Sequence, residues 1–137
     1  MKRILFTIVL FMACLAAHAQ TAPERAERFL DEVATPESDA AFDRLFAGSG
    51  FAELKPQALA TLKSQTKMAM GLYGKPIGIE KIREEDLSPS LKRLVYLQKF
   101  EGYPVAWEFY FYRPKTEWLI NQIQFKDQVD SLIGARQ

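Results

Sequence analysis

The last third of the chain constrains the fold most, because its side chains alternate with the period of a β-strand. Between residues 105 and 112 the odd positions are all apolar: Val105, Trp107, Phe109 and Phe111. The even positions mix small, acidic and phenolic groups: Ala106, Glu108, Tyr110 and Tyr112. Successive side chains of a strand point to opposite faces of its sheet. We therefore predict a sheet whose apolar face is covered by other elements.

The neighbouring segments predict three more strands. We expect a short strand at 77–83, clearer strands at 94–101 and 117–126, and a polar connection at 84–89. Short links with Gly or Pro, at 102–104 and 113–116, join the last three strands. Links of this kind between β-rich runs indicate an antiparallel meander.

Alternation also assigns the flanking strands to two faces. In the last strand we place Leu119, Asn121, Ile123 and Phe125 on the covered face, opposite Trp118, Ile120, Gln122 and Gln124. In the 94–101 strand Val95 and Leu97 oppose Leu94, Tyr96, Gln98 and Phe100. We place Tyr96 on the second face, together with Tyr110.

Residues 21–74 have the apolar spacing of helices. Residues 21–47 predict two helices, or one bent helix, with a break near Pro36. A third helix begins at Lys55-Pro56 and ends at Gly71 and Gly74. Helices followed by an antiparallel meander predict an α+β fold. We expect two or three N-terminal helices packed on one face of a curved antiparallel sheet of about four strands, in a single domain over residues 20–137.

The first nineteen residues have the pattern of a secretory signal peptide. Lys2 and Arg3 precede an apolar run, residues 4–17, that is shorter than the roughly 20 residues of a membrane-spanning helix. Ala17-His18-Ala19 then predicts cleavage between Ala19 and Gln20. Lipoprotein processing at Cys14 is the alternative, although Phe11 replaces the leucine usual three residues earlier. We expect a periplasmic or secreted protein without a membrane span, or a lipid-anchored one.

Removal of this leader restricts the available chemistry. Cys14 and His18 are the only cysteine and the only histidine, and both leave with it. The mature chain then has no thiolate, no imidazole base and no Cys/His metal site, so we expect no metal and no cofactor. The leader takes Lys2 and Arg3 from 18 basic residues and none of the 17 acidic ones, so the two counts stay nearly equal. Net charge thus favours neither nucleic acid nor an anionic membrane surface as a partner.

The second face of the predicted sheet carries aromatic side chains that suit an interface. We assign Tyr96, Tyr110, Tyr112 and Trp118 to it, since Tyr and Trp combine apolar area with a polar group. This face could form a homodimer or bind an envelope protein. The alternative is that its aromatic residues stabilise the sheet by cross-strand pairing alone.

A second candidate site is the space between helices and sheet. Asn121 lies in an otherwise apolar set and could point an amide into a small apolar pocket, with Tyr73 and Trp107 as further lining residues. The alternative is a structural role for Asn121, with its amide satisfied by neighbours. We identify no catalytic residue.

Two segments carry a resemblance to a known superfamily. Residues 72–77 (Leu-Tyr-Gly-Lys-Pro-Ile) lead from helix to strand, and residues 107–111 and 115–120 form a closing hairpin with a tryptophan in each arm. Over about residues 24–126 the chain resembles the nuclear-transport-factor-like, or cystatin-like, α+β cone superfamily, and its small secreted bacterial members of unassigned function. That superfamily includes isomerase-like enzymes, dehydratases, ligand binders and protein-binding domains, so the resemblance does not choose among them.

Three functions remain open. The first is an exported non-catalytic binding or assembly module that acts through the aromatic sheet face or a small apolar pocket. The second, implied by the resemblance, is an isomerase or dehydratase that acts on a small apolar molecule; against it, the predicted covered face has no Asp, Glu or Tyr on the last two strands. The third is an inhibitor or immunity-type partner of a secreted enzyme, with residues 84–86 as an acidic docking loop.

Overall fold

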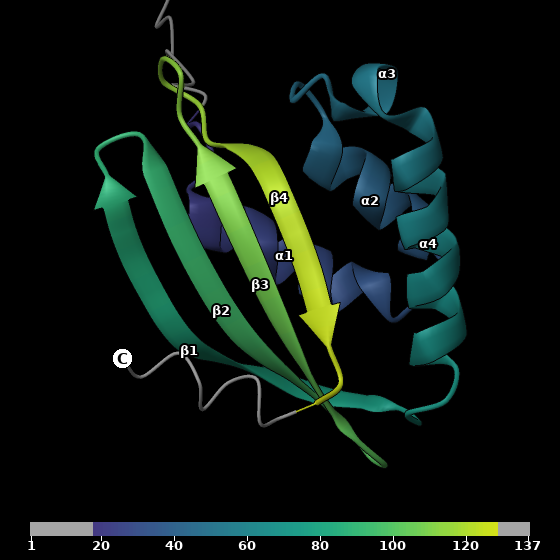
Figure 1. Cartoon of the computed structure of the whole chain (residues 1–137). Coiled ribbons are helices and arrows are strands. Elements are labelled where there is room, and N and C mark those ends of the chain that lie inside the picture. Colours follow the sequence, from purple (N-terminus) through teal and green to yellow (C-terminus); the bar gives the residue numbers. More distant parts are fainter. Residues whose placement is uncertain (1–17, 129–137) are drawn as a thin grey trace, which may run out of the picture.

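The structure, a computed structural model, describes residues 18–128 as an α+β fold (Figure 1). The helices come first: α1 (Ala22–Val33), α2 (Ser38–Phe46), α3 (Phe51–Leu54) and α4 (Pro56–Met70). The strands follow: β1 (Pro76–Ser88), β2 (Leu91–Phe100), β3 (Pro104–Tyr112) and β4 (Leu119–Lys126). They form one antiparallel sheet in the order β1-β2-β3-β4, curved and not closed. The predicted fold class is confirmed.

The helices cover one face of the sheet and its β4 edge. In Figure 1, α1 crosses the back of the sheet, and α2 and α4 stand beyond β4. α2 contacts β4, whereas α4 packs mainly on α2 and α3. None of the helices within residues 18–128 is long and apolar enough to span a membrane.

A capping box explains where α1 begins. The hydroxyl of Thr21 accepts a hydrogen bond from the Glu24 amide (3.3 Å), and the Glu24 carboxylate accepts one from the Thr21 amide (2.8 Å). Two amides that the helix end would leave unpaired are therefore satisfied. The helix ends at Val33, and Pro36 separates it from α2 as predicted.

Arg25 joins α1 to two other elements. Its guanidinium donates to the carbonyl of Leu45 (2.8 Å) in the last turn of α2, and to the carbonyl of Trp118 just before β4. A cation is favourable at a helix C-terminus, where the last carbonyls lack partners within the helix. Arg25 thereby fixes the backbone at Trp118 relative to both helices.

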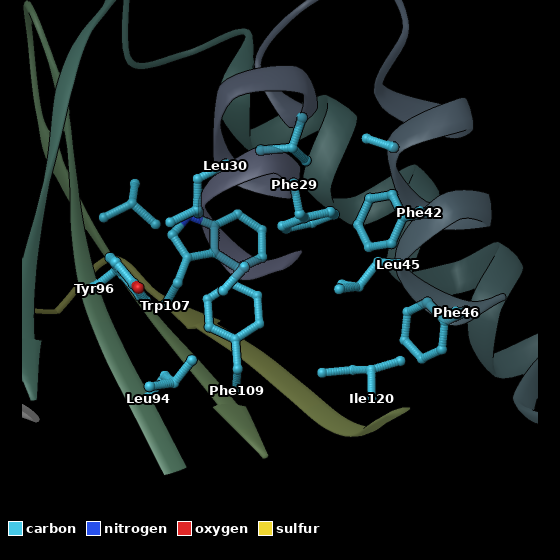
Figure 2. Close-up of a cluster of buried hydrophobic side chains, with 14 of the residues drawn as sticks. Phe29, Leu30, Phe42, Leu45, Phe46, Leu94, Tyr96, Trp107, Phe109 and Ile120 are labelled. Atoms are coloured by element: carbon cyan, nitrogen blue, oxygen red, sulfur yellow. The ribbon is translucent and has the colours of Figure 1, made fainter. Parts of the chain in front are cut away.

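The covered face of the sheet is the predicted apolar one. Val105, Trp107, Phe109 and Phe111 of β3 are all completely buried. Phe29 of α1 lies against them, with its ring edge-on to Trp107 (5.3 Å between centroids) and Phe109 (5.9 Å). Figure 2 shows Phe29 between the sheet residues and Phe42 of α2, so one cluster joins α1, α2 and the sheet.

The assignment of β2 to faces was wrong. Tyr96 pairs directly with Trp107 of β3, and residues directly opposite share a face. Tyr96 is therefore on the covered face with Leu94 and Gln98, and only 1% of it is exposed. Figure 2 shows its ring beside Trp107 in the core.

β4 contains a bulge that overturns its predicted alternation. Gln122 pairs with Tyr110, but the next pair joins Ile120 to Phe111, so Asn121 has no partner in the register. A bulge adds one residue and reverses the facing of every residue beyond it. Ile120 is consequently buried against the core, and Asn121 is exposed instead of covered.

β1 is longer than predicted. It spans 13 residues and includes Glu84, Glu85 and Asp86, which we had assigned to a polar connection. Its acidic side chains pair with basic ones of β2: Glu84 and Asp86 with Lys92, and Glu85 with Arg93. Cross-strand ion pairs, rather than apolar burial, extend this edge strand.

Candidate functional site

A groove of about 700 Å³ lies at the end of the sheet where β1 turns into β2. We call it the end groove. Five stretches of chain meet there: the start of α1, the end of β1, the following turn, the start of β2 and the β3–β4 connection. Its charged and aromatic lining consists of Glu84, Asp86, Lys92, Arg113 and Trp118. Its volume is in the range of small-molecule sites.

Trp118 is the aromatic group of the end groove. The Arg113 guanidinium carbon lies 4.6 Å from the centre of its ring and the Lys92 Nζ lies 5.7 Å from it. Arg113 also joins the β3–β4 connection to the turn between β1 and β2. Its amide donates to Ser90 O (2.8 Å) and its Nη2 donates to Pro89 O (2.9 Å). The indole of Trp118 is therefore a partly buried aromatic surface with the cations of Arg113 and Lys92 beside it.

Ion pairs order the opposite side of the groove. Lys92 Nζ lies 2.7 Å from an Asp86 oxygen and 3.2 Å from a Glu84 oxygen, and Lys81 binds the other Glu84 oxygen at 2.7 Å. The hydrogen bond to Asp86 raises the pKa of Lys92, and the hydrogen bond from Lys81 lowers the pKa of Glu84. Both shifts favour the charged forms of Lys92 and Glu84, so the groove offers both signs of charge beside an aromatic ring.

A carboxylate–tyrosine pair lies near this end of α1. The Tyr96 hydroxyl donates to Glu27 Oε1 (2.9 Å), and Glu27 is one turn from Pro23, which lines the groove. Burial and the Glu27 carboxylate raise the pKa of Tyr96, and Glu84 of the groove adds to the effect. Side-chain alternation alone does not predict this pair, because it leaves Tyr96 on the opposite face of the sheet.

The three residues predicted to line a pocket do not come together. Trp107 is completely buried, and its Nε1 donates to Gln98 (2.8 Å). Tyr73 is half-buried, stacks on Tyr103 and donates to Asp127 (3.1 Å). Asn121 is exposed at the bulge of β4. The predicted apolar site between helices and sheet is therefore not formed by these side chains.

The buried amide of the core is Gln98, which sequence reasoning did not single out. Its oxygen accepts from Trp107 Nε1 and its nitrogen donates to the carbonyl of Leu30 (2.9 Å), near the end of α1. Gln98 thus satisfies one of the carbonyls that a helix C-terminus leaves unpaired. The sequence signal for a buried Gln98 is that the other residues on its face of the strand, Leu94, Tyr96 and Phe100, are apolar or aromatic.

The outer face of the sheet keeps two of its four predicted aromatic residues. Tyr110 is half-buried and Tyr112 is 45% exposed, whereas Tyr96 is in the core and Trp118 lines the end groove. The same face also carries the apolar residues Val95, Leu97 and Ala106, and on it Arg93 binds Glu108 (2.6 Å) and Glu85 (3.4 Å). Burial alone would raise the pKa of Glu108, but hydrogen bonds from Tyr110 and Arg93 lower it. Ion pairs and apolar side chains are therefore mixed on this face.

The predicted leader falls mostly outside residues 18–128, and so do Cys14 and the apolar run. Ala19 and Gln20 are exposed and belong to no helix or strand, directly before the Thr21 cap of α1. Cleavage between them stays a prediction, as does the location of the protein.

The chain matches no protein-family model, no curated protein and no solved structure. The resemblance to the nuclear-transport-factor-like superfamily accordingly stays a prediction. Within the described part of the chain, no group of three or more His, Cys, Asp or Glu side chains is arranged to hold a metal ion.

Proposed function

We propose that this protein is an exported, non-catalytic binding module and that the end groove is its binding site. The observation that carries the proposal is the indole of Trp118, flanked by Arg113 and Lys92 in a hollow of about 700 Å³. Aromatic and arginine side chains are the groups that dominate binding energy in most interfaces. The apolar pocket and the aromatic sheet face of the sequence analysis are less favoured, because their residues are buried or dispersed.

The lining of the end groove defines the class of ligand. The ring of Trp118 suits a flat or apolar group, and Arg113 has N–H groups beyond the one that binds Pro89. Asp86 offers a carboxylate that is 69% exposed, so a positive group can also be held. We infer a small polar molecule or a peptide segment that carries charged groups next to an aromatic or aliphatic one.

A binding role without catalysis agrees with the chemistry present. The mature chain predicted from the leader has neither histidine nor cysteine. The carboxylates of the groove are engaged by lysines, and Arg113 is held by backbone carbonyls and Trp118. Groups fixed in this way are suited to recognition rather than to proton transfer.

A ligand-observed NMR screen tests the proposal. A library of charged small molecules and short peptides is screened against the wild-type protein, a Trp118→Leu variant and an Arg113→Gln variant. We expect binding compounds to lose their signal changes with both variants. The matched control is Tyr112→Leu on the outer face of the sheet, which should bind like the wild type. Compounds that need Tyr112 but neither groove residue would move the site to the outer face and overturn the assignment.

The second candidate function is the isomerase-like or dehydratase-like enzyme, and one observation favours it. Glu27 and Tyr96 form the pair of carboxylate and phenol that such chemistry needs without histidine. Tyr96 is however almost completely buried and already bonded to Glu27. If the protein turns over a small apolar molecule that the groove binds, Glu27→Gln should abolish turnover while binding persists.

The inhibitor hypothesis is not supported, because the predicted docking loop at residues 84–86 is part of a strand. Glu84, Glu85 and Asp86 lie within β1 and pair with β2, so they do not protrude as a docking segment. Homodimer formation and an envelope partner remain proposals, and the screen above would show whether a peptide of such a partner binds.

A further inference from the structure

The end of the molecule opposite the end groove exposes three large apolar side chains. Leu72 is 78% exposed, Met68 70% and Ile77 61%. Met68 is in the last turn of α4 and Leu72 follows the helix by two residues, while Ile77 is the second residue of β1. The β2–β3 turn borders them, since Gly102 N donates to Tyr73 O and Glu101 N to Lys75 O (both 2.9 Å). Figure 1 shows these three segments at one end of the molecule.

Two lysines, Lys67 and Lys75, lie close to the apolar residues of this tip in the sequence. Residues 55–79 contain Lys55, Lys63, Lys67 and Lys75 and no acidic residue. Lys63 pairs with Asp43, but Lys67 and Lys75, which flank the tip, form no ion pair with any residue in the range 18–128. The nearly balanced net charge of the chain thus conceals a strongly uneven distribution, because eight of the acidic residues lie in the segment 21–54.

Three acids lie near the tip, and one of them is in an ion pair. Glu80 binds Lys99 (2.9 Å), and Asp127 accepts from the Tyr73 hydroxyl (3.1 Å). Glu101 is the remaining carboxylate beside the turn. Lys67 and Lys75 are both exposed and lie close in the chain to Met68 and Leu72.

We propose that this tip, formed by Met68, Leu72, Ile77, Lys67 and Lys75, docks onto an anionic lipid bilayer. Apolar side chains at a projecting end can enter the boundary between headgroups and acyl chains, while long lysine side chains reach back to the phosphates. A two-fold contact between copies of this chain fits less well, because it would bring the unpaired lysines of both copies together. The inference goes beyond the binding function proposed above and does not depend on it.

The exposed apolar side chains and the lysines together predict that the protein attaches reversibly to the bilayer. Three partly inserted side chains give marginal binding by themselves, and each lysine close to an anionic surface adds about a fivefold gain in partitioning. The electrostatic part is screened by salt, because the Debye length is only about 8 Å at physiological ionic strength. Binding should therefore need acidic lipid and weaken as salt is added.

Vesicle flotation tests this inference. The probes are phosphatidylglycerol–phosphatidylcholine vesicles and pure phosphatidylcholine vesicles. We expect the wild-type protein to float with the first and not with the second. Leu72→Ser with Ile77→Ser, and separately Lys67→Gln with Lys75→Gln, should each lower partitioning by about tenfold or more. The matched controls are Leu87→Ser at the far end of β1 and Lys115→Gln in the β3–β4 connection, and both should bind like the wild type.

Two results would overturn the inference: absence of flotation with acidic vesicles, or flotation that the tip variants leave unchanged. Self-association that Leu72→Ser abolishes, measured by sedimentation, would also contradict it and identify the tip as a contact between copies. Trp118→Leu should retain vesicle binding, so failure of the end groove proposal and failure of this one are distinguishable. Circular dichroism of every variant shows whether it is folded.

Discussion

At the scale of single residues, the buried amide of Gln98 shows what side-chain alternation can and cannot predict. An amide within the covered core was expected, but it was assigned to Asn121. The core amide is Gln98, which is bonded to Trp107 and Leu30, while Asn121 is exposed. Alternation gives the spacing of side chains along a strand, but it does not choose between two faces when both carry apolar residues. Tyr96 and Gln98 were misplaced for that reason.

Replacing Gln98 should reveal how much this amide contributes. Gln98→Met keeps the volume but leaves Trp107 Nε1 and the carbonyl of Leu30 buried without partners. We expect the free energy of unfolding to fall by about 2–6 kcal/mol in urea denaturation, since each of the two unsatisfied groups costs about 1–3 kcal/mol. The control Gln122→Met changes an exposed residue of β4 and should stay within about 0.5 kcal/mol of the wild type. Equal effects of the two changes would contradict the assignment.

The Glu27–Tyr96 pair predicts a dependence of stability on pH. The pKa of Tyr96 is raised in the folded protein by burial and by Glu27, relative to about 10 in the unfolded chain. Its contribution is fully present below pH 10 and is lost as the pH rises above that value, because the unfolded phenol ionises first. Denaturation curves of the wild type and Tyr96→Phe should therefore approach each other above about pH 10. A difference that does not vary with pH would argue against a buried neutral phenol.

At the scale of elements, the sequence predicted α1, α2, α4 and β3 within a few residues. Helical spacing, capping and proline positions are local signals, so they are visible without tertiary structure. The one-turn helix α3 was missed, because four residues are too few to show a helical period. The extent of β1 and the bulge of β4 depend on partners in other strands: Lys92 and Arg93 for β1, and Tyr110 and Phe111 for β4. The residues of β1 and β4 show no local pattern that predicts the length of β1 or the bulge of β4.

Arg25 should matter more to the assembly of these elements than its neighbour Arg28. Arg25→Met removes the donors to Leu45 O and Trp118 O and should lower the free energy of unfolding by about 2 kcal/mol. Arg28→Met, on the same helix, removes the exposed pair with Glu32 and should cost about 0.5 kcal/mol or less. Thermal unfolding of both variants measures the difference. Similar midpoints would show that Arg25 does not join α1, α2 and β4 energetically.

At the scale of the whole molecule, the order of helices and strands was enough to predict the α+β class. The end groove was not predictable in the same way. Trp118 was singled out, but as part of a sheet face, and Lys92 and Arg113 were not considered at all. The groove forms where five stretches of chain meet, so its composition depends on tertiary contacts such as Arg113 to Pro89 and Ser90. Alternation and turn signals describe each stretch separately and cannot bring them together.

The leader makes a prediction about the exported chain. Intact-mass analysis of the protein recovered from the exported fraction should give the mass of residues 20–137. This processing leaves Thr21 and the capping box of α1 intact, one residue from the new terminus. A larger mass that retains Cys14 with attached lipid would instead establish the lipid-anchored alternative.

The end groove as a ligand site is the central claim, and chemical-shift mapping tests it most directly. A compound from the screen is titrated into isotopically labelled protein while the indole of Trp118, the side chain of Arg113 and the amides of β1 near Glu84 are followed. The account predicts that these signals shift together, saturate at one affinity and remain still in Trp118→Leu. Shifts confined to Tyr110 and Tyr112, or to the tip around Leu72, with the groove signals unmoved, would contradict it.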